Sequence, residues 1–227
     1  MRFPLTVIFL AFLYTQSSFA GSDSLTIIVA PELADTLQQL SDSSPELSDS
    51  FPVMADTFSV IGVGDIMMGT DYPSRIYLPP GDDCRQLLKD VHDILGNADI
   101  TFGNLEGSFA GEAGTPKNCK DTTKCFVFRM PGHYVHCLYE AGFDMMSMAN
   151  NHSNDFGTGG RDETEWILEG NGLAYAGSLS TPYTVLVRRG IRYGMIAFAP
   201  NKGCYSIKDT EQALQLLEEL RERCDIM

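Results

Sequence analysis

The sequence of 227 residues is poor in basic side chains: 16 Lys and Arg stand against 30 Asp and Glu, which gives a formal charge of -14. Proteins that bind nucleic acids need cationic side chains for the phosphate backbone, so this balance argues against a nucleic-acid partner. It does not exclude phosphate esters, because a bound metal cation can supply the positive charge. The hydrophobic content of 44% is ordinary for a globular domain.

No apolar run reaches the length of a transmembrane helix. Residues 3–14 form a shorter apolar run behind Arg2, and the Ser-Phe-Ala sequence at 18–20 matches the pattern of signal-peptide cleavage. We therefore expect residues 1–20 to be a signal peptide that is cleaved after Ala20. The mature protein would be exported to the periplasm or the extracellular space, either soluble or associated with the membrane. An uncleaved anchor is the alternative.

The sequence has no Cys-x-x-Cys motif, which argues against a zinc site built from cysteines. Its six cysteines fit an oxidising compartment without forming a dense framework of disulfides. Cys119 and Cys125 flank a short polar loop that a disulfide between them would close. Either disulfides or buried free thiols fit the remaining cysteines, which are Cys84, Cys137, Cys204 and Cys224.

Internal repeats are also absent. Residues 21–56 are interpreted as a lead-in segment, with one strand at 25–30, one helix at 31–40 and then a linker rich in Ser, Asp and Pro. The main domain is expected to occupy residues 57–227. One long loop is expected within it, at residues 111–129.

Apolar runs alternate with amphipathic segments along the main domain. Strands are predicted at 58–65, 98–107, 143–149 and 173–177, followed by a hairpin at 183–200. Helices are predicted at 83–95, 132–142, 159–172 and 209–224. In the first of these helices, Leu87, Leu88, Val91, Ile94 and Leu95 would share one buried face. This alternation predicts an α/β fold with a mainly parallel sheet and helices on its faces.

Three of the predicted strands end in polar residues, at Asp65, at Asn104 to Glu106 and at Asn150 to His152. Parallel strands end at the same edge of a sheet, where α/β proteins bind their ligands. Carboxylates supply hard oxygen ligands, and an asparagine supplies a neutral carbonyl oxygen. Such ligands suit pairs of Mn, Fe, Zn or Mg ions in hydrolytic sites. His152 is placed to act on a leaving group.

The runs GDIMMG, GNLEG and ANNHSNDFG resemble, in this order and spacing, the CapA-type capsule and poly-γ-glutamate biosynthesis proteins. These proteins are relatives of the calcineurin-like metallophosphoesterases. The resemblance covers about Phe58 to Met227. It implies a metallophosphoesterase-like α/β/β/α sandwich, incomplete at the C-terminus, that binds divalent metal ions.

The resemblance also implies roles for individual residues. Asp65 would bind one metal ion, Glu106 would bridge the two ions, and Asn151 would bind the second ion. His152 would be the catalytic or phosphate-contacting imidazole. Asp155 would assist it by orienting either His152 or the loop.

Two features depart from the pattern of metallophosphoesterases. Their usual Asp-x-His is replaced by Asp65-Ile66-Met67, and no histidine follows His152. We therefore expect the second half of the two-metal site to be missing, as in a truncated product or a fragment.

Asn104 and Asn150 would hold the turns of the site through side-chain hydrogen bonds.

The leading hypothesis for function is metal-assisted phosphoester hydrolysis by an exported protein that helps to make or export an anionic surface polymer. Its partners would be that polymer or a phosphoester substrate, and a membrane-bound synthase complex. One alternative is an accessory subunit that binds the polymer without catalysis. A second alternative is a secreted nucleotidase or phosphodiesterase without a role in the capsule.

Each candidate residue also has an ordinary structural interpretation. Asp65 would be a turn residue, Glu106 a solvated charge, and Asn151 with His152 a helix N-cap. Ordinary roles are expected at further positions: a surface histidine at His92, a solvated or salt-bridged Arg129, and core packing for Met145, Met146 and Met148. His133 and His136 have a spacing that can bind a metal ion, but structural roles are expected for them.

Overall fold

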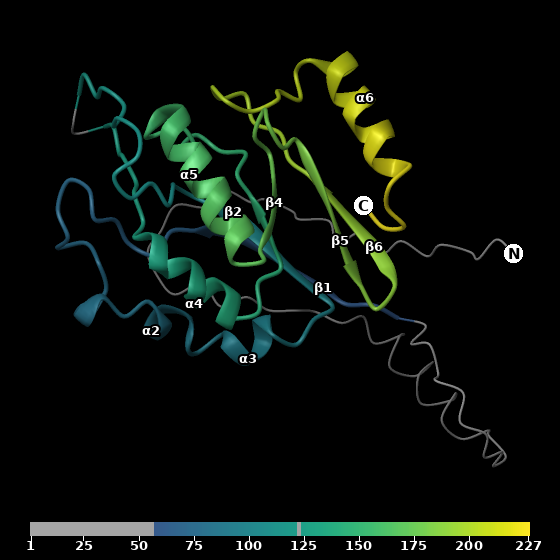
Figure 1. Cartoon of the computed structure of the whole chain (residues 1–227), viewed down its shortest axis with the longest axis horizontal. Coiled ribbons are helices and arrows are strands. Elements are labelled where there is room, and N and C mark those ends of the chain that lie inside the picture. Colours follow the sequence, from purple (N-terminus) through teal and green to yellow (C-terminus); the bar gives the residue numbers. More distant parts are fainter. Residues whose placement is uncertain (1–56, 122–123) are drawn as a thin grey trace, which may run out of the picture. The chain divides into compact units, whose positions relative to one another are not determined.

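The computed structural model describes residues 57–121 and 124–227. The predicted signal peptide, lead-in strand, lead-in helix and linker lie outside these residues. None of the helices in the described part is long and apolar enough to cross a membrane. Figure 1 shows the elements, which are β1 (Val60–Ile66), η1 (Pro80–Asp82), α2 (Arg85–Leu88), α3 (His92–Leu95), β2 (Ile100–Leu105), η2 (Gly132–Tyr134), α4 (Val135–Glu140), β3 (Met145–Ser147), α5 (Gly157–Gly170), β4 (Ala174–Ala176), β5 (Tyr183–Arg188), β6 (Ile191–Ile196) and α6 (Thr210–Arg221).

The centre of the fold is a four-stranded sheet in the order β1-β2-β3-β4, in which all neighbouring strands are parallel. This confirms the predicted α/β class and the strands on which the prediction rested. Side chains alternate between the two faces of the sheet. In β3, for example, Met146 joins the core on the helical face and Met145 joins the core on the opposite face.

Helices α2 to α5 cover the first face of this sheet. Leu95, Leu138 and Leu168 come from three of these helices and pack in the same core as Leu105 and Met146 of the strands. Val63 of β1 packs against the same core. Burial of such apolar side chains is the main force that holds a layer of helices to a sheet.

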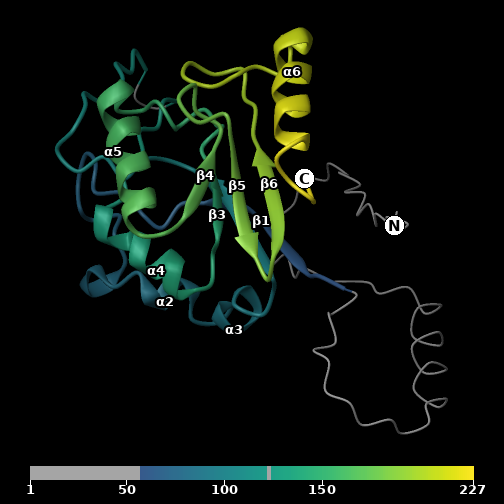
Figure 2. The ribbon, with the colours of Figure 1, turned by 45° about the vertical axis from the view of Figure 1, so that its right-hand side comes forward.

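The second face carries the antiparallel hairpin of β5 and β6, with α6 on its outer side (Figure 2). Tyr193 points towards the sheet and packs with Ile100 and Met145. The next residue, Gly194, faces α6, where an added Cβ would lie 2.9 Å from the Leu220 side chain. The layers therefore follow the order helices, sheet, hairpin and helix, which confirms the expected α/β/β/α arrangement.

The prediction of one continuous helix at 83–95 is wrong. The chain forms the short helices α2 and α3, which are separated by a turn at residues 89–91. Leu87, Val91 and Ile94 are exposed, whereas Leu95 is buried. The segment is fixed at one end by the disulfide of Cys84 and at the other end by Leu95. These tertiary anchors override the helical periodicity.

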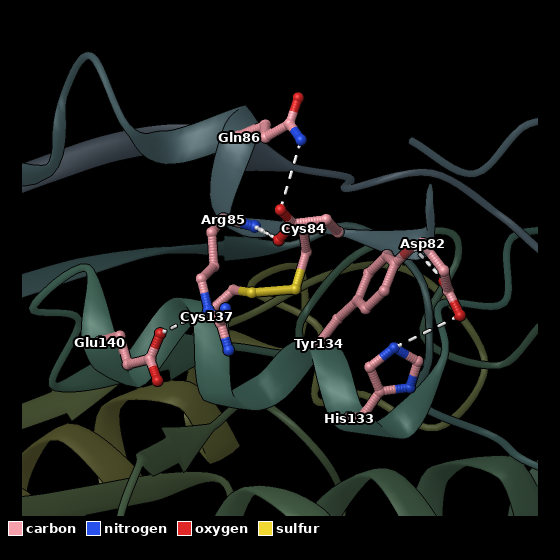
Figure 3. The surroundings of a disulfide bond; sticks show 9 residues. Asp82, Cys84, Arg85, Gln86, His133, Tyr134, Cys137 and Glu140 are labelled. Atoms are coloured by element: carbon pink, nitrogen blue, oxygen red, sulfur yellow. Dashed lines mark hydrogen bonds and ion pairs between the residues drawn. A yellow bond between two sulfur atoms is a disulfide. The ribbon is translucent and has the colours of Figure 1, made fainter. Parts of the chain in front are cut away.

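Two disulfides cross-link the described chain. Cys119–Cys125 closes the short polar loop that these cysteines flank, and Cys84–Cys137 joins the segment before α2 to α4 (Figure 3). The second bond lies beside Tyr134, whose hydroxyl donates a hydrogen bond to Asp82 at 2.7 Å. The Cys84–Cys137 disulfide ties the least regular part of the helical layer to the buried face of α4.

Replacing both cysteines of the second disulfide, as in the double substitution Cys84→Ser with Cys137→Ser, is expected to lower the free energy of unfolding. The two residues are separated by 53 positions. The loop-closure entropy restored to the unfolded chain predicts a loss of about 2–4 kcal/mol. Urea denaturation of the oxidised protein and the double variant measures this loss. A loss below about 0.5 kcal/mol would contradict the structural role.

Candidate functional site

The ends of β1, β2 and β3 place their polar residues at one edge of the sheet. The pairing of β1 with β2 shifts by one residue between Gly62 and Asp65, so that Asp65 pairs with Asn104. Such a bulge changes the direction in which a side chain points. Here it brings the Asp65 carboxylate within hydrogen-bond distance of the Asn104 amide.

A chain of amide hydrogen bonds connects the three strand ends. The backbone N–H of His152 donates to Asn150 Oδ1 at 2.9 Å. Asn150 Nδ2 donates to Asn104 Oδ1 at 3.0 Å. Asn104 Nδ2 then donates to Asp65 Oδ1 at 2.7 Å and to Glu106 Oε2 at 3.0 Å. Each amide accepts through oxygen and donates through nitrogen, so its orientation is fixed by its neighbours.

The two carboxylates are therefore held on either side of one amide group. Burial and the nearby charge of Asp65 raise the pKa of Glu106 above its ordinary value of 4.5. The charge of His152 and the hydrogen bond from Asn104 act in the opposite direction. Burial and like charge together make this pair unfavourable when both groups are ionised, which a bound cation would relieve.

His152 is held by Asp155, whose side chain is fully buried. His152 Nδ1 lies 2.8 Å from Asp155 Oδ2, and its Nε2 lies 3.6 Å from Glu106 Oε1. The same Asp155 oxygen accepts a hydrogen bond from the backbone N–H of Phe128 at 2.8 Å. A carboxylate on Nδ1 fixes the ring and leaves Nε2 directed towards the strand ends.

Sequence reasoning missed two residues that support this histidine. Lys117 Nζ lies 2.5 Å from Asp155 Oδ1, and the Phe128 ring packs on His152 with 4.3 Å between ring centroids. Gly107 permits this approach, because it has a φ of 127° and an added Cβ would lie 3.1 Å from Phe128 Cβ. Lys117 and Phe128 lie in the irregular loop, where no periodic pattern indicates which side chains turn inward.

Asn151 lies at the same edge but is exposed, and its side chain makes no hydrogen bond to the described residues. Within residues 57–121 and 124–227, no three or more His, Cys, Asp or Glu side chains lie close enough together to bind a metal ion as a group. The chemistry of Asp65 and Glu106 still fits a hard divalent cation, because both are carboxylates held close by Asn104. Two closely spaced metal ions would need further ligands.

The other polar residues singled out in the sequence have ordinary surroundings. His92, His133 and His136 are all exposed. Arg129 Nε forms an ion pair with Asp71 Oδ1 at 2.6 Å, as the structural interpretation predicted. The three methionines of the β3 segment are buried in the core, which confirms their predicted role: Met145, Met146 and Met148.

The layered α/β fold, with acidic and amide side chains at the carboxyl edge of its sheet, agrees with comparisons to known proteins. The model of the family described as bacterial capsule synthesis protein PGA_cap matches residues 59–223. The chain therefore belongs to this family, whose fold is metallophosphoesterase-like.

Individual relatives match a shorter part of the chain. The capsule biosynthesis protein CapA of Bacillus anthracis is 32% identical over 116 residues, which are 51% of this chain and 27% of CapA. The uncharacterised proteins y4sH and y4uA of Sinorhizobium fredii are each 30% identical over 121 residues, which are 52% of this chain and 24% of theirs. The matched segments thus span about a quarter of the length of these relatives.

The raised pKa of Glu106 predicts a pH dependence of stability in metal-free buffer. A carboxyl group whose folded pKa lies above its unfolded value of 4.5 holds more protons in the folded protein. Its contribution to stability is complete below the unfolded pKa and is lost as pH rises through the folded pKa. The substitution Glu106→Gln removes this loss while keeping an oxygen acceptor for Asn104.

We therefore compare the free energy of unfolding of Glu106→Gln with that of the unaltered protein. The difference, variant minus unaltered protein, is expected to grow as the pH rises from about 4 to about 7. Urea denaturation with a chelator present measures it. Glu112→Gln removes the same charge from an exposed loop and serves as the matched control. A difference between Glu106→Gln and the unaltered protein that stays constant over this range would contradict the raised pKa.

Proposed function

We propose that this protein hydrolyses a phosphoester bond with the help of a divalent cation, as part of the synthesis or export of an anionic surface polymer. The observation that supports this proposal most directly is the geometry of the strand ends. Two carboxylates share one amide donor, and the imidazole of His152 is directed towards one of them. This combination of ligands and an oriented histidine suits metal-assisted hydrolysis.

Asp65 and Glu106 would hold the cation, and the exposed Asn151 would add an amide oxygen. When bound, a divalent cation polarises a phosphoryl oxygen and lowers the pKa of bound water. The chain contributes the position and proton of His152. Because Asp155 accepts from Nδ1, the proton on Nε2 of the charged imidazole is available to the oxygen of the leaving group.

Packing supports the same role for His152. The ring is mostly buried between Phe128 and the acidic residues, and so its orientation is restricted. Asp155 is itself held by Lys117 and by the backbone of Phe128. A histidine fixed by several partners can meet a substrate oxygen without first losing rotational freedom.

The biological setting of the proposal comes from the family. CapA of Bacillus anthracis carries the description capsule biosynthesis protein. By this relationship, the substrate would be a phosphoester or the surface polymer itself, and the partner a membrane-bound synthase complex. The N-terminal sequence supports export, either to the periplasm or to the extracellular space.

A second candidate function is binding of the polymer without catalysis. One observation favours it: the described residues contain no cluster of three or more His, Cys, Asp or Glu in the arrangement of a metal cage. In this case the strand-end cluster, which consists of Asp65, Asn104, Glu106 and His152, would hold a single cation or ligand for recognition. The protein would be an accessory subunit of the assembly complex.

Hydrolysis of diphenyl phosphate in the presence of Mn²⁺, followed by the release of phenol, tests the catalytic proposal, because phenol is a poor leaving group that needs a proton donor. The substitution His152→Ala is expected to lower kcat by about a hundredfold or more, because it removes the proton donor to the leaving group. His92→Ala removes an exposed histidine on α3, outside the candidate site, and is expected to keep the full rate.

Equal rates for both variants would show that His152 has no catalytic role. If the unaltered protein fails to hydrolyse the ester but binds poly-γ-glutamate, and His152→Ala binds it equally well, the accessory function replaces the catalytic one.

A further inference from the structure

An open cleft of about 840 Å³ lies beside the strand-end cluster. Small-molecule sites typically occupy roughly 300–1,000 Å³. One wall is the loop after β1, with Met67, Tyr72 and Tyr77. The opposite wall is formed by residues 116–119 and 125–128, which flank the Cys119–Cys125 disulfide, and it includes Phe126 and Phe128. Both walls present mainly apolar and aromatic side chains.

Specific contacts hold the two walls in place. The backbone N–H of Arg129 donates to Thr70 Oγ1 at 3.0 Å, and Arg129 also pairs with Asp71, so that the second wall is joined to the first. Thr70 forms a β-bridge with Tyr77. Gly69 has a φ of 102°, and an added Cβ would lie 2.7 Å from the Tyr77 carbonyl oxygen. These contacts fix the positions of both walls, so the cleft is part of the folded structure.

The cleft offers little positive charge to a polyanion. Lys117 is the only charged side chain among the described residues that line it, and its ammonium group is paired with Asp155. Thr70 Oγ1 already accepts hydrogen bonds from the backbone N–H groups of Tyr72 and Arg129. A ligand that enters the cleft therefore gains more from apolar contact than from ion pairing.

A series of aromatic rings connects the cleft to the candidate catalytic histidine. Phe126 stacks on Phe128 with 6.2 Å between centroids and an interplanar angle of 22°. Phe128 in turn packs on His152 at 4.3 Å. An apolar group in the cleft would thus lie next to the rings that border His152.

We propose that this cleft binds the apolar alcohol portion of a phosphoester, so that the ester oxygen of the ligand faces His152. The protein is then expected to prefer alkyl phosphates over phosphoesters whose alcohol portion is polar. The orientation of the ligand, with its ester oxygen towards His152, rests on the proposed phosphoesterase function. The binding of the apolar portion depends only on the cleft itself.

Calorimetric titration of the full chain with octyl phosphate, glycerol phosphate and inorganic phosphate tests the proposal. Octyl phosphate is expected to bind at least about tenfold more tightly than glycerol phosphate, because its chain leaves water for an apolar cleft. Tyr77→Ala and Phe126→Ala are expected to weaken octyl phosphate binding by about 3- to 10-fold each. They should leave the binding of inorganic phosphate unchanged.

Trp166→Ala is the matched control, because Trp166 is an exposed aromatic residue on α5 that does not line the cleft. It should bind all three ligands like the unaltered protein. Tyr77 and Phe126 are also largely exposed, at 58% and 59%, so their removal should leave the folded core intact.

Equal affinity for octyl and glycerol phosphate would overturn the proposal, as would equal weakening by Trp166→Ala. Titration of His152→Ala separates this inference from the catalytic one. If that variant and the unaltered protein both bind octyl phosphate and neither hydrolyses an ester, the cleft assignment stands and the phosphoesterase function fails.

Discussion

The arrangement of the site depends on one element, the hydrogen-bonded amides of Asn150 and Asn104. They join the backbone of the His152 turn to the carboxylates of Asp65, near the end of β1, and Glu106, just after β2. Strand pairing alone sets the distance between neighbouring backbones but does not orient the side chains beyond the last ladder bond. The amide chain supplies this orientation, because each member has a defined donor and acceptor.

The same arrangement concentrates negative charge at the edge of the sheet. Burial of Glu106, and after it the nearby charge of Asp65, raises the pKa of Glu106 above its ordinary value. The protein places a fixed His152 and an apolar cleft next to this charge. An enzyme that acts on an ester with an apolar alcohol needs all three features, and a purely structural turn needs none of them.

Much of the fold was predictable from the sequence, because β1 to β4 are short apolar runs that end in glycine or polar residues and α6 is strongly amphipathic. The segment at 83–95 was not, since its disulfide partner Cys137 lies far along the chain. The strand-end positions of Asp65, Glu106 and His152 followed from parallel topology. Lys117 and Phe128 could not be predicted, because they reach His152 from an irregular loop through tertiary contacts only.

The central claim is that the strand-end cluster binds a divalent cation. Electron paramagnetic resonance tests it directly, because the signal of free Mn²⁺ decreases when the ion binds to protein. We predict that the unaltered protein decreases the signal and that the double variant Asp65→Asn with Glu106→Gln does not. If the unaltered protein leaves the signal unchanged, or the double variant binds Mn²⁺ equally well, the cluster is not a metal site and the account is wrong.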